Sequence, residues 1–194
     1  MYDGAEAAAL ELARQGLRYV SAYNDPAVIA GQGTIASELL EALEGPLTIV
    51  VPAGGGGLLS GVALWATQRP GVRVVGVESS ASPAIRAALT AGEIVPIEVL
   101  PSLADGLAGN LEPGSLTLEL VRRHADDVVV VAEEDVAAGM RFLWREHGIV
   151  AEGSGAIAAG ALLAGRIERT GTTVCLVTGR NVAEDLFARV VAST

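Results

Sequence analysis

The stretch LTIVVPAGGGGLLSGVALWATQ, residues 47–68, contains three structural signals in succession. Residues 47–51 are apolar and rich in β-branched side chains, which is typical of a strand buried on both faces of a parallel sheet. Four consecutive glycines, Gly54 to Gly57, follow, and residues 58–68 then have the composition of a helix. No residue here is charged, but Pro52 and the glycines interrupt the segment. We therefore expect a strand, a turn and a helix rather than a membrane span.

The same alternation continues in both directions along the chain. The expected strands are residues 17–21, 47–51, 72–78, 127–132 and 172–177. The expected helices are residues 3–15, 32–43, 58–68, 82–91, 115–124, 133–147, 154–164 and 182–192, with an irregular connection over 92–113. Ser82 is the expected N-cap of the helix over 82–91. This pattern predicts an α/β fold in three αβα layers, with a mostly parallel sheet covered on both faces. Because no linker divides the chain, we expect residues 1–194 to form a single domain.

The glycine run is the strongest candidate for a binding site. A turn without side chains between a strand and a helix lets backbone N–H groups approach a phosphate, and the positive end of the helix adds to the attraction. The alternative is a turn that only joins two elements. The run is neither a Walker loop nor a G-x-G-x-x-G dinucleotide motif. Glu78 nevertheless ends the next strand where an acid could hold a ribose, so a nucleotide-binding Rossmann domain stays open.

Two further polar residues are candidates for the same site. Thr178 follows the strand expected over 172–177, and ligands of open parallel sheets lie beyond the carboxyl ends of the strands. Its hydroxyl could bind a ring nitrogen of a ligand, or it could cap the next helix. Glu152 is the only charged residue in 148–165, which marks it as a candidate functional carboxylate. A carboxylate at a helix start, with Ser154 as the cap, explains it equally well.

The composition excludes several classes of partner. The net charge is −10, from 23 acidic and 13 basic residues, and every basic residue is an arginine. This charge repels nucleic acid and anionic lipid, so we expect neither as a partner. Cys175 is the only cysteine, and no cysteine–histidine cluster has zinc spacing. A lone thiol and the absence of a signal-peptide pattern at the start lead us to expect a cytoplasmic protein.

Taken together, six motifs resemble the fold-type II pyridoxal-phosphate (PLP) enzymes, and among them the threonine/serine dehydratase (ammonia-lyase) and serine racemase group. In chain order they are DPAVIAGQGT (25–34), VVPAGGGGLLSGVA (50–63), VVGVES (74–79), SLADGLA (102–108), VAEGSGA (150–156) and LVTGRN (176–181). Any one of them would be weak evidence, but all six follow the family's order over nearly the whole chain. The resemblance implies the large-domain part of a tryptophan synthase β-like fold.

The resemblance also implies a cofactor, its ligands and a reaction. The cofactor is pyridoxal 5'-phosphate, and the residues implied to bind it are Gly54, Gly55, Gly56, Gly57 and Leu58 at its phosphate, Thr178 at its pyridine nitrogen and Glu152 near its ring. The implied activity is that of a PLP-dependent lyase. It converts a hydroxy amino acid, the small-molecule substrate, to a 2-oxo acid and ammonia by β-elimination.

The chain departs from the family's pattern in three places. Arg180 stands where glycine is usual. Some relatives bind a divalent metal through an acid matching Glu78 and a second acid a few residues on, but Ser82 and Ala84 occupy that stretch, so we expect no metal. The family's Ser-Phe-Lys-type motif, whose lysine bonds covalently to the cofactor, and its Ser/Thr-Gly-Asn substrate loop have no counterpart, so we assign no catalytic residue to this chain.

These departures lead us to expect a truncated or split C-terminal portion of such an enzyme, without the N-terminal lysine segment and small domain. Arginine cannot replace the lysine, because it is always protonated and a poor nucleophile. The chain alone is then expected to be inactive, with a homodimer or the missing N-terminal segment as its partner. The alternatives are a non-catalytic remnant that binds PLP or another phosphate, a partner subunit, and the nucleotide-binding Rossmann domain.

Overall fold

The computed structural model describes residues 2–193 of the chain. Its helices are α1 (Tyr2–Arg14), α2 (Pro26–Ala42), α3 (Gly57–Ala66), α4 (Ala84–Ala91), α5 (Leu116–His124), α6 (Glu133–His147), α7 (Gly153–Leu163) and α8 (Glu184–Ala192), with a short 3-10 helix at Asp105–Leu107. Its strands are β1 (Leu47–Pro52), β2 (Val72–Ser79), β3 (Asp127–Val131) and β4 (Thr172–Cys175).

The four strands form one parallel sheet in the order β3-β2-β1-β4. All six residues of β1 are buried, as its β-branched composition predicts for a central strand covered on both faces. Leu47 pairs with Val72 of β2 on one side and with Thr172 of β4 on the other. The strands that alternate with helices along the sequence therefore pair in parallel throughout the sheet.

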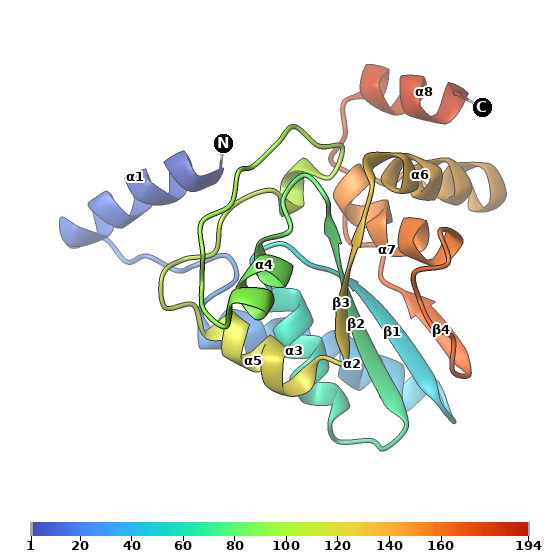
Figure 1. Ribbon diagram of the computed structural model, residues 1–194, viewed down its shortest axis with the longest axis horizontal. Helices are drawn as coiled ribbons and strands as arrows, with labels where there is room; N and C mark the ends of the chain where they lie inside the picture. The colour runs from blue at the N-terminus through green and yellow to red at the C-terminus, as the bar shows by residue number, and fades with distance from the viewer. Residues whose placement is uncertain (1, 194) are drawn as a thin grey trace.

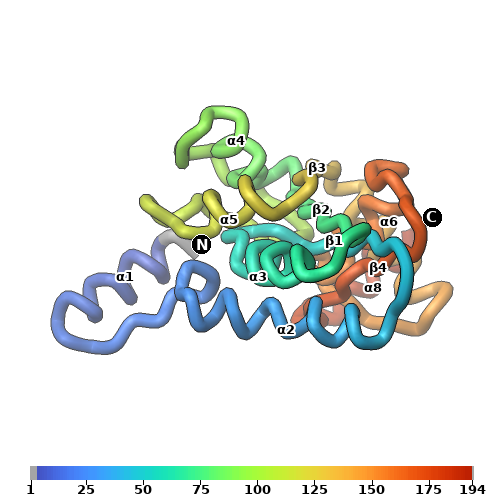
Figure 2. The backbone as a smooth tube through the Cα atoms, turned by 90° about the horizontal axis from the view of Figure 1, so that it is seen from below, coloured from blue at the N-terminus to red at the C-terminus, as the bar shows by residue number. Residues whose placement is uncertain are grey.

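Helices cover both faces of the sheet, and Figure 1 shows α2, α3, α4 and α5 on one side and α6, α7 and α8 on the other. The view turned by 90° in Figure 2 shows the same separation. One core cluster packs β1 and β2 against the first group of helices, and a second packs the opposite face against α7 and the start of α6. The predicted three-layer α/β fold with a mostly parallel sheet is confirmed.

Some predicted local features are wrong. Residues 17–21 form no strand, because this segment pairs with no strand of the sheet, whose members are β1 to β4. The helix expected from residue 32 begins at Pro26, where the Asp25 carboxylate caps the N–H groups of Ala27 and Val28. Both differences concern the segment 15–31, whose short polar residues hid the helix start.

The carboxyl ends of β1 and β4 meet at one edge of the sheet. Leu176, just after β4, donates its backbone N–H to the carbonyl of Val50 at 3.0 Å. The chain leaves β1 toward α3 and β2, whereas β4 lies on the other side of β1. Ligands of open α/β sheets bind outside the carboxyl ends of the strands at this kind of reversal. The fold therefore brings the glycine turn after β1 close to the segment after β4.

Helix α1 projects from the body of the molecule, at the end opposite to α6 and α8 (Figures 1 and 2). It exposes Leu10 and Leu12, and the segment that follows it exposes Leu17 and Val20. Among residues 2–193, no helix combines the length and the apolar character that crossing a bilayer requires. The uncharged stretch 46–68 contains β1, the glycine turn and all of α3, as the sequence predicts.

Candidate functional site

The glycine turn connects β1 to the N-terminus of α3. Gly56 is the N-cap residue of α3 and has a φ of +86°, a left-handed conformation that favours glycine. The backbone N–H groups of Gly54, Gly55 and Gly56 donate to no other group among residues 2–193. Unpaired N–H groups at the positive end of a helix are the usual elements of a phosphate site. The turn therefore has the donors that the sequence interpretation requires.

The glycines also make room for the protein's own packing. A Cβ on Gly55 would collide with the ring of Tyr23, and one on Gly57 would lie 2.7 Å from the Tyr23 carbonyl oxygen. A Cβ on Gly54 would lie 2.9 Å from the carbonyl oxygen of Leu107. The absence of side chains thus serves two purposes: it lets two neighbouring segments approach, and it leaves the backbone accessible.

One cavity of about 270 Å³ contains most of the predicted site residues. Its lining includes all four glycines of the turn, Leu58 and Thr178. The remaining wall comes from Ala22, Tyr23, Gln32, Pro52 and the segment 105–110. The structure thus brings together residues that lie more than a hundred positions apart, from the turn after β1 and the segment after β4.

The alternative roles of Thr178 and Ser154 as helix caps are wrong. Helix α8 begins at Glu184 with Ala183 as its N-cap, well beyond Thr178. Helix α7 has Glu152 itself as N-cap, and the buried Ser154 hydroxyl has no hydrogen-bond partner among the described residues. Thr178 is exposed where it lines the cavity, so its hydroxyl is available to a ligand.

Glu152 lies beside the cavity rather than in its lining. Its backbone N–H donates to the carbonyl of Gly179 at 3.1 Å, and a Cβ on Gly179 would collide with its carboxylate. A Cβ on Gly106 would lie 3.8 Å from the same carboxylate. Glu152 is therefore held between the segment that carries Thr178 and the segment 105–110, next to two parts of the cavity wall.

The electrostatics of the cavity come from the backbone. Its lining includes no arginine or histidine from the described part of the chain, and Asp105 contributes a carboxylate to it. An anion in this cavity would be bound by peptide N–H groups and by the N-terminal end of α3, without an ion pair. The residues present fit a single phosphate group in contact with the glycine turn. How tightly the turn binds that phosphate depends on the direction in which each of its N–H groups points.

A polar network holds the glycine turn from the side of α5. The Thr117 hydroxyl donates to the carbonyl of Gly55 at 2.8 Å and lies 2.8 Å from the Ser115 hydroxyl. Asn24 accepts the backbone N–H of Leu116 at 2.7 Å and donates to the Glu112 carboxylate at 2.8 Å. The loop before α2 and the start of α5 are thereby tied to the turn.

A second network holds the segment 102–110, whose residues 105–110 line the cavity. The Glu133 carboxylate accepts the Ser79 hydroxyl at 2.7 Å, the Ser102 hydroxyl at 2.6 Å and the backbone N–H of Leu103 at 2.6 Å. Ser102 in turn accepts the N–H of Ala104 at 2.9 Å. One carboxylate at the start of α6 therefore joins the end of β2 to the segment that closes the cavity.

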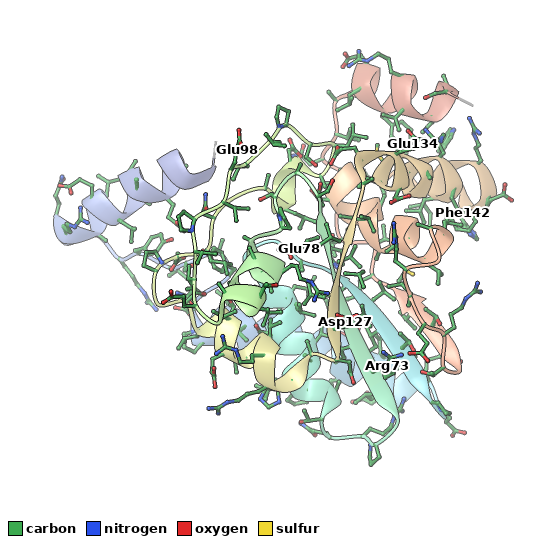
Figure 3. All side chains as sticks on the ribbon, viewed as in Figure 1. Arg73, Glu78, Glu98, Asp127, Glu134 and Phe142 are labelled. Carbon is green, nitrogen blue, oxygen red and sulfur yellow. The ribbon has the colours of Figure 1, made fainter. Side chains whose placement is uncertain are left out.

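Glu78 does not face the cavity. It is fully buried and points toward α4, where its two oxygens accept the N–H groups of Ile85 at 2.7 Å and Arg86 at 2.8 Å (Figure 3). Burial raises its pKa to about 7, against the lowering effect of these two donors and of the Arg86 charge. Its carboxylate is thus engaged at α4 rather than facing the glycine turn, which removes the basis for the ribose-binding interpretation.

The stretch after Glu78 differs from the cap expected there. Helix α4 has Pro83 rather than Ser82 as its N-cap, and the Ser82 hydroxyl instead donates to the carbonyl of Gly109 at 3.1 Å. No group of three or more metal-binding side chains occurs in the part of the chain that the structure describes.

The sequence did not single out Tyr23, Thr117 and Glu133 as site residues. Tyr23 stands directly before the Asn24-Asp25-Pro26 turn, and Glu133 is one of three acids at a helix start, so local chemistry explains both. Thr117 lies in the first turn of α5. Their roles depend on contacts with segments 30 to 89 positions away in the chain, which no local pattern encodes.

The comparisons with known proteins agree on one family. Residues 1–179 match the model described as pyridoxal-phosphate dependent enzyme. The chain is 40% identical to an L-threonine ammonia-lyase of Thermotoga maritima over 98% of its own length and 48% of that protein. Among solved structures, threonine deaminase isoform 2 of Solanum lycopersicum, in its processed form, matches with a TM-score of 0.85 and 30% identity, over 95% of this chain and 56% of that one.

Maize serine racemase matches with a TM-score of 0.78 and 33% identity, over 88% of this chain and 54% of that one. The chain spans about half the length of the curated relatives it matches, such as 48% of the Thermotoga maritima protein.

Proposed function

Because the chain belongs to the pyridoxal-phosphate dependent enzyme family, we propose that it forms the cofactor-binding part of an ammonia-lyase acting on a hydroxy amino acid such as threonine or serine. The observation that carries this proposal is the single cavity lined by the glycine turn and by Thr178. The names of the relatives, threonine ammonia-lyase and threonine deaminase, support the substrate class.

We assign the residues as follows. The backbone N–H groups of the turn bind the phosphate of PLP, through Gly54, Gly55, Gly56, Gly57 and Leu58. The Thr178 hydroxyl binds the pyridine nitrogen, and Glu152 lies near the ring. A neutral hydroxyl at that nitrogen leaves it without the full charge that a carboxylate partner would stabilise, which suits β-elimination.

When bound, PLP supplies an electron-withdrawing ring that stabilises negative charge at the α-carbon of an amino acid. The covalent bond between this cofactor and an enzyme needs a primary amine of lowered pKa. The 194 residues include no lysine, and the guanidinium groups of the 13 arginines stay protonated. The chain therefore binds and orients the cofactor, and the amine comes from outside these residues.

Two further assignments belong to the proposal. We place the protein in the cytoplasm, supported by a single, partly buried free thiol at Cys175. We expect it to associate with another polypeptide, either a second copy or a lysine-bearing partner. The exposed Leu10, Leu12, Leu17 and Val20 on and after α1 support such a contact, because exposed apolar clusters commonly mark interfaces.

The binding test uses the 194-residue chain, equilibrium dialysis and two ligands, PLP and NAD. We expect saturable binding of PLP and none of NAD, because the turn fits one phosphate and Glu78 is not available to a ribose. The reverse result would replace this proposal with a nucleotide-binding function.

The turnover test adds threonine or serine to the PLP-loaded chain and measures 2-oxo acid. We expect no more product than free PLP gives, because the chain contains no lysine. Product above that background would show that another group of this chain replaces the primary amine in the reaction. Continued absence of activity with every lysine-bearing partner would favour a non-catalytic PLP-binding protein.

A further inference from the structure

The peptide bond between Gly55 and Gly56 is held by one buried side chain. The Thr117 hydroxyl donates to the carbonyl oxygen of Gly55 at 2.8 Å, and Thr117 is fully buried. Its side chain also lies close to the next residue, because a Cβ added to Gly56 would be 3.0 Å from the Thr117 Cβ. Thr117 therefore binds the carbonyl of this peptide group from the side of α5 and leaves no room for a side chain on Gly56.

A trans peptide is planar, and its C=O and N–H point in opposite directions. A donor that fixes the Gly55 carbonyl consequently also fixes the direction of the Gly56 N–H, which points away from Thr117. That N–H donates to no group among the described residues, and Gly56 lines the cavity. The hydroxyl of Thr117 and a ligand in the cavity would thus bind opposite ends of one peptide dipole.

This peptide needs such a constraint because glycine lies on both sides of it. Gly56 has a φ of +86°, and glycine reaches negative φ values about as easily, so rotation of the peptide plane is cheap. The hydrogen bond from Thr117 selects one of the two orientations. In the other orientation the carbonyl would turn toward the cavity and would repel an anion.

The proton arrangement around Thr117 supports this selection. Thr117 and Ser115 each carry one hydroxyl proton, and their oxygens lie 2.8 Å apart. If Ser115 donates to Thr117 and Thr117 donates to Gly55, the buried carbonyl of Gly55 is satisfied, as buried carbonyls normally are. The Ser115 hydroxyl also lies 3.1 Å from Asn24 Oδ1, but that oxygen already accepts the N–H of Leu116 at 2.7 Å, and the shorter contact of Ser115 is the one with Thr117.

We propose that Thr117 is a positioning residue that orients the Gly55–Gly56 peptide so that the Gly56 N–H binds the phosphate of the ligand. The effect is large in this cavity because its described lining offers an anion no cationic side chain. The inference rests on the proposed function only for the identity of the phosphate-bearing molecule.

The test compares the full chain with Thr117→Val, which removes the hydroxyl at nearly constant size, and with Thr117→Ser, which keeps it. Dissociation constants are measured for PLP and for pyridoxal, which lacks the phosphate. We expect the valine variant to bind PLP about tenfold more weakly and the serine variant to stay within about twofold. Pyridoxal binding stays unchanged in both. Equal binding by all three proteins, or parallel losses for both ligands, would overturn the proposal.

A second measurement follows the amide signals of ¹⁵N-glycine-labelled protein while inorganic phosphate is added. The Gly56 signal should shift in the wild-type and serine proteins, and only at higher phosphate in the valine variant. If the wild-type chain binds no PLP but phosphate moves Gly56 as described, the role of Thr117 stands and the proposed function fails. If PLP binds and phosphate leaves Gly56 unmoved, the proposed function stands and the role of Thr117 fails.

Where the valine variant does not fold, Thr117→Cys takes its place, because a thiol of similar size is a weak donor. The PLP affinity of the cysteine variant is then expected to lie between that of the wild-type protein and that of a site without a hydroxyl donor. Its affinity for pyridoxal should again stay unchanged. A cysteine variant that binds PLP as tightly as the wild-type protein would contradict the proposal.

Discussion

The carboxylate of Glu78 accepts the backbone N–H of Ile85 at 2.7 Å in the interior of the molecule. Burial raises the pKa of Glu78 from 4.5 to about 7, so the folded protein binds a proton where the unfolded chain is ionised. The free energy of unfolding should therefore fall as the pH rises from about 4.5 to about 7, by about 3 kcal/mol from this group.

Urea unfolding at several pH values tests this relationship against Glu78→Gln. The glutamine variant should lack the decrease, so the stability difference between the two proteins changes across that pH range. Glu98→Gln is the control, because Glu98 is exposed on the connection after α4 (Figure 3). Parallel pH profiles for wild-type and Glu78→Gln would show that Glu78 titrates normally.

Gly56→Ala should weaken both the fold and the site. The φ of +86° strains any other residue, and the new Cβ would lie 3.0 Å from the Thr117 Cβ. Gly92→Ala is a matched control, since Gly92 has a φ of +82° with open space around its Cβ position. We expect a loss of about 1 kcal/mol in the control and more in Gly56→Ala. Dialysis should show weaker PLP binding only for Gly56→Ala.

Glu133→Gln should loosen the segment 102–110, which supplies part of the cavity wall. The amide offers one acceptor oxygen where the carboxylate accepts three donors, so one buried donor loses its partner. We expect a loss of about 1–3 kcal/mol in thermal or urea unfolding. Glu134→Gln, one position along, removes only an exposed ion pair with Arg141 and should cost less than about 1 kcal/mol. Equal losses would indicate a general charge effect.

Thr178→Val should affect the ring of the ligand rather than its phosphate. Thr178 is exposed, so the stability should change by less than about 0.5 kcal/mol. We expect PLP and pyridoxal to lose affinity by the same factor, about three- to tenfold, with Thr178→Ser close to the wild-type protein. This pattern is the opposite of that expected for Thr117→Val. A loss of affinity for PLP alone would indicate that Thr178 contacts the phosphate of the ligand rather than its ring.

The chain should associate at high concentration through its α1 region. Leu12 is 48% exposed on α1 and Leu17 is 60% exposed just after it, and exposed apolar side chains of this kind favour association. Sedimentation velocity should show larger species as the concentration rises, and fewer of them for the double variant Leu12→Gln, Leu17→Gln. A wild-type protein that stays monomeric at every concentration would contradict this expectation.

The sequence alone predicted the layered α/β fold and the position of the glycine turn. Both follow from local signals: apolar β-branched runs, helical periodicity and four glycines between two elements. The strand expected over 17–21 failed because its residues favour an extended conformation but pair with no strand of the sheet. Ser82 is not a cap because its hydroxyl donates to the carbonyl of Gly109, and Ser154 is not one because it lies inside the first turn of α7, after the N-cap Glu152.

The order of the strands, and with it the composition of the cavity, was decided only by the tertiary structure. Thr178 lines the same cavity as the glycine turn because β4 pairs with β1 from the far end of the chain. Tyr23 reaches the turn from the loop before α2, and Thr117 from α5, through contacts that no local pattern encodes. Propensity and periodicity act over a few residues, whereas these contacts depend on how separate elements pack, so the sequence identified the turn and the fold determined what surrounds it.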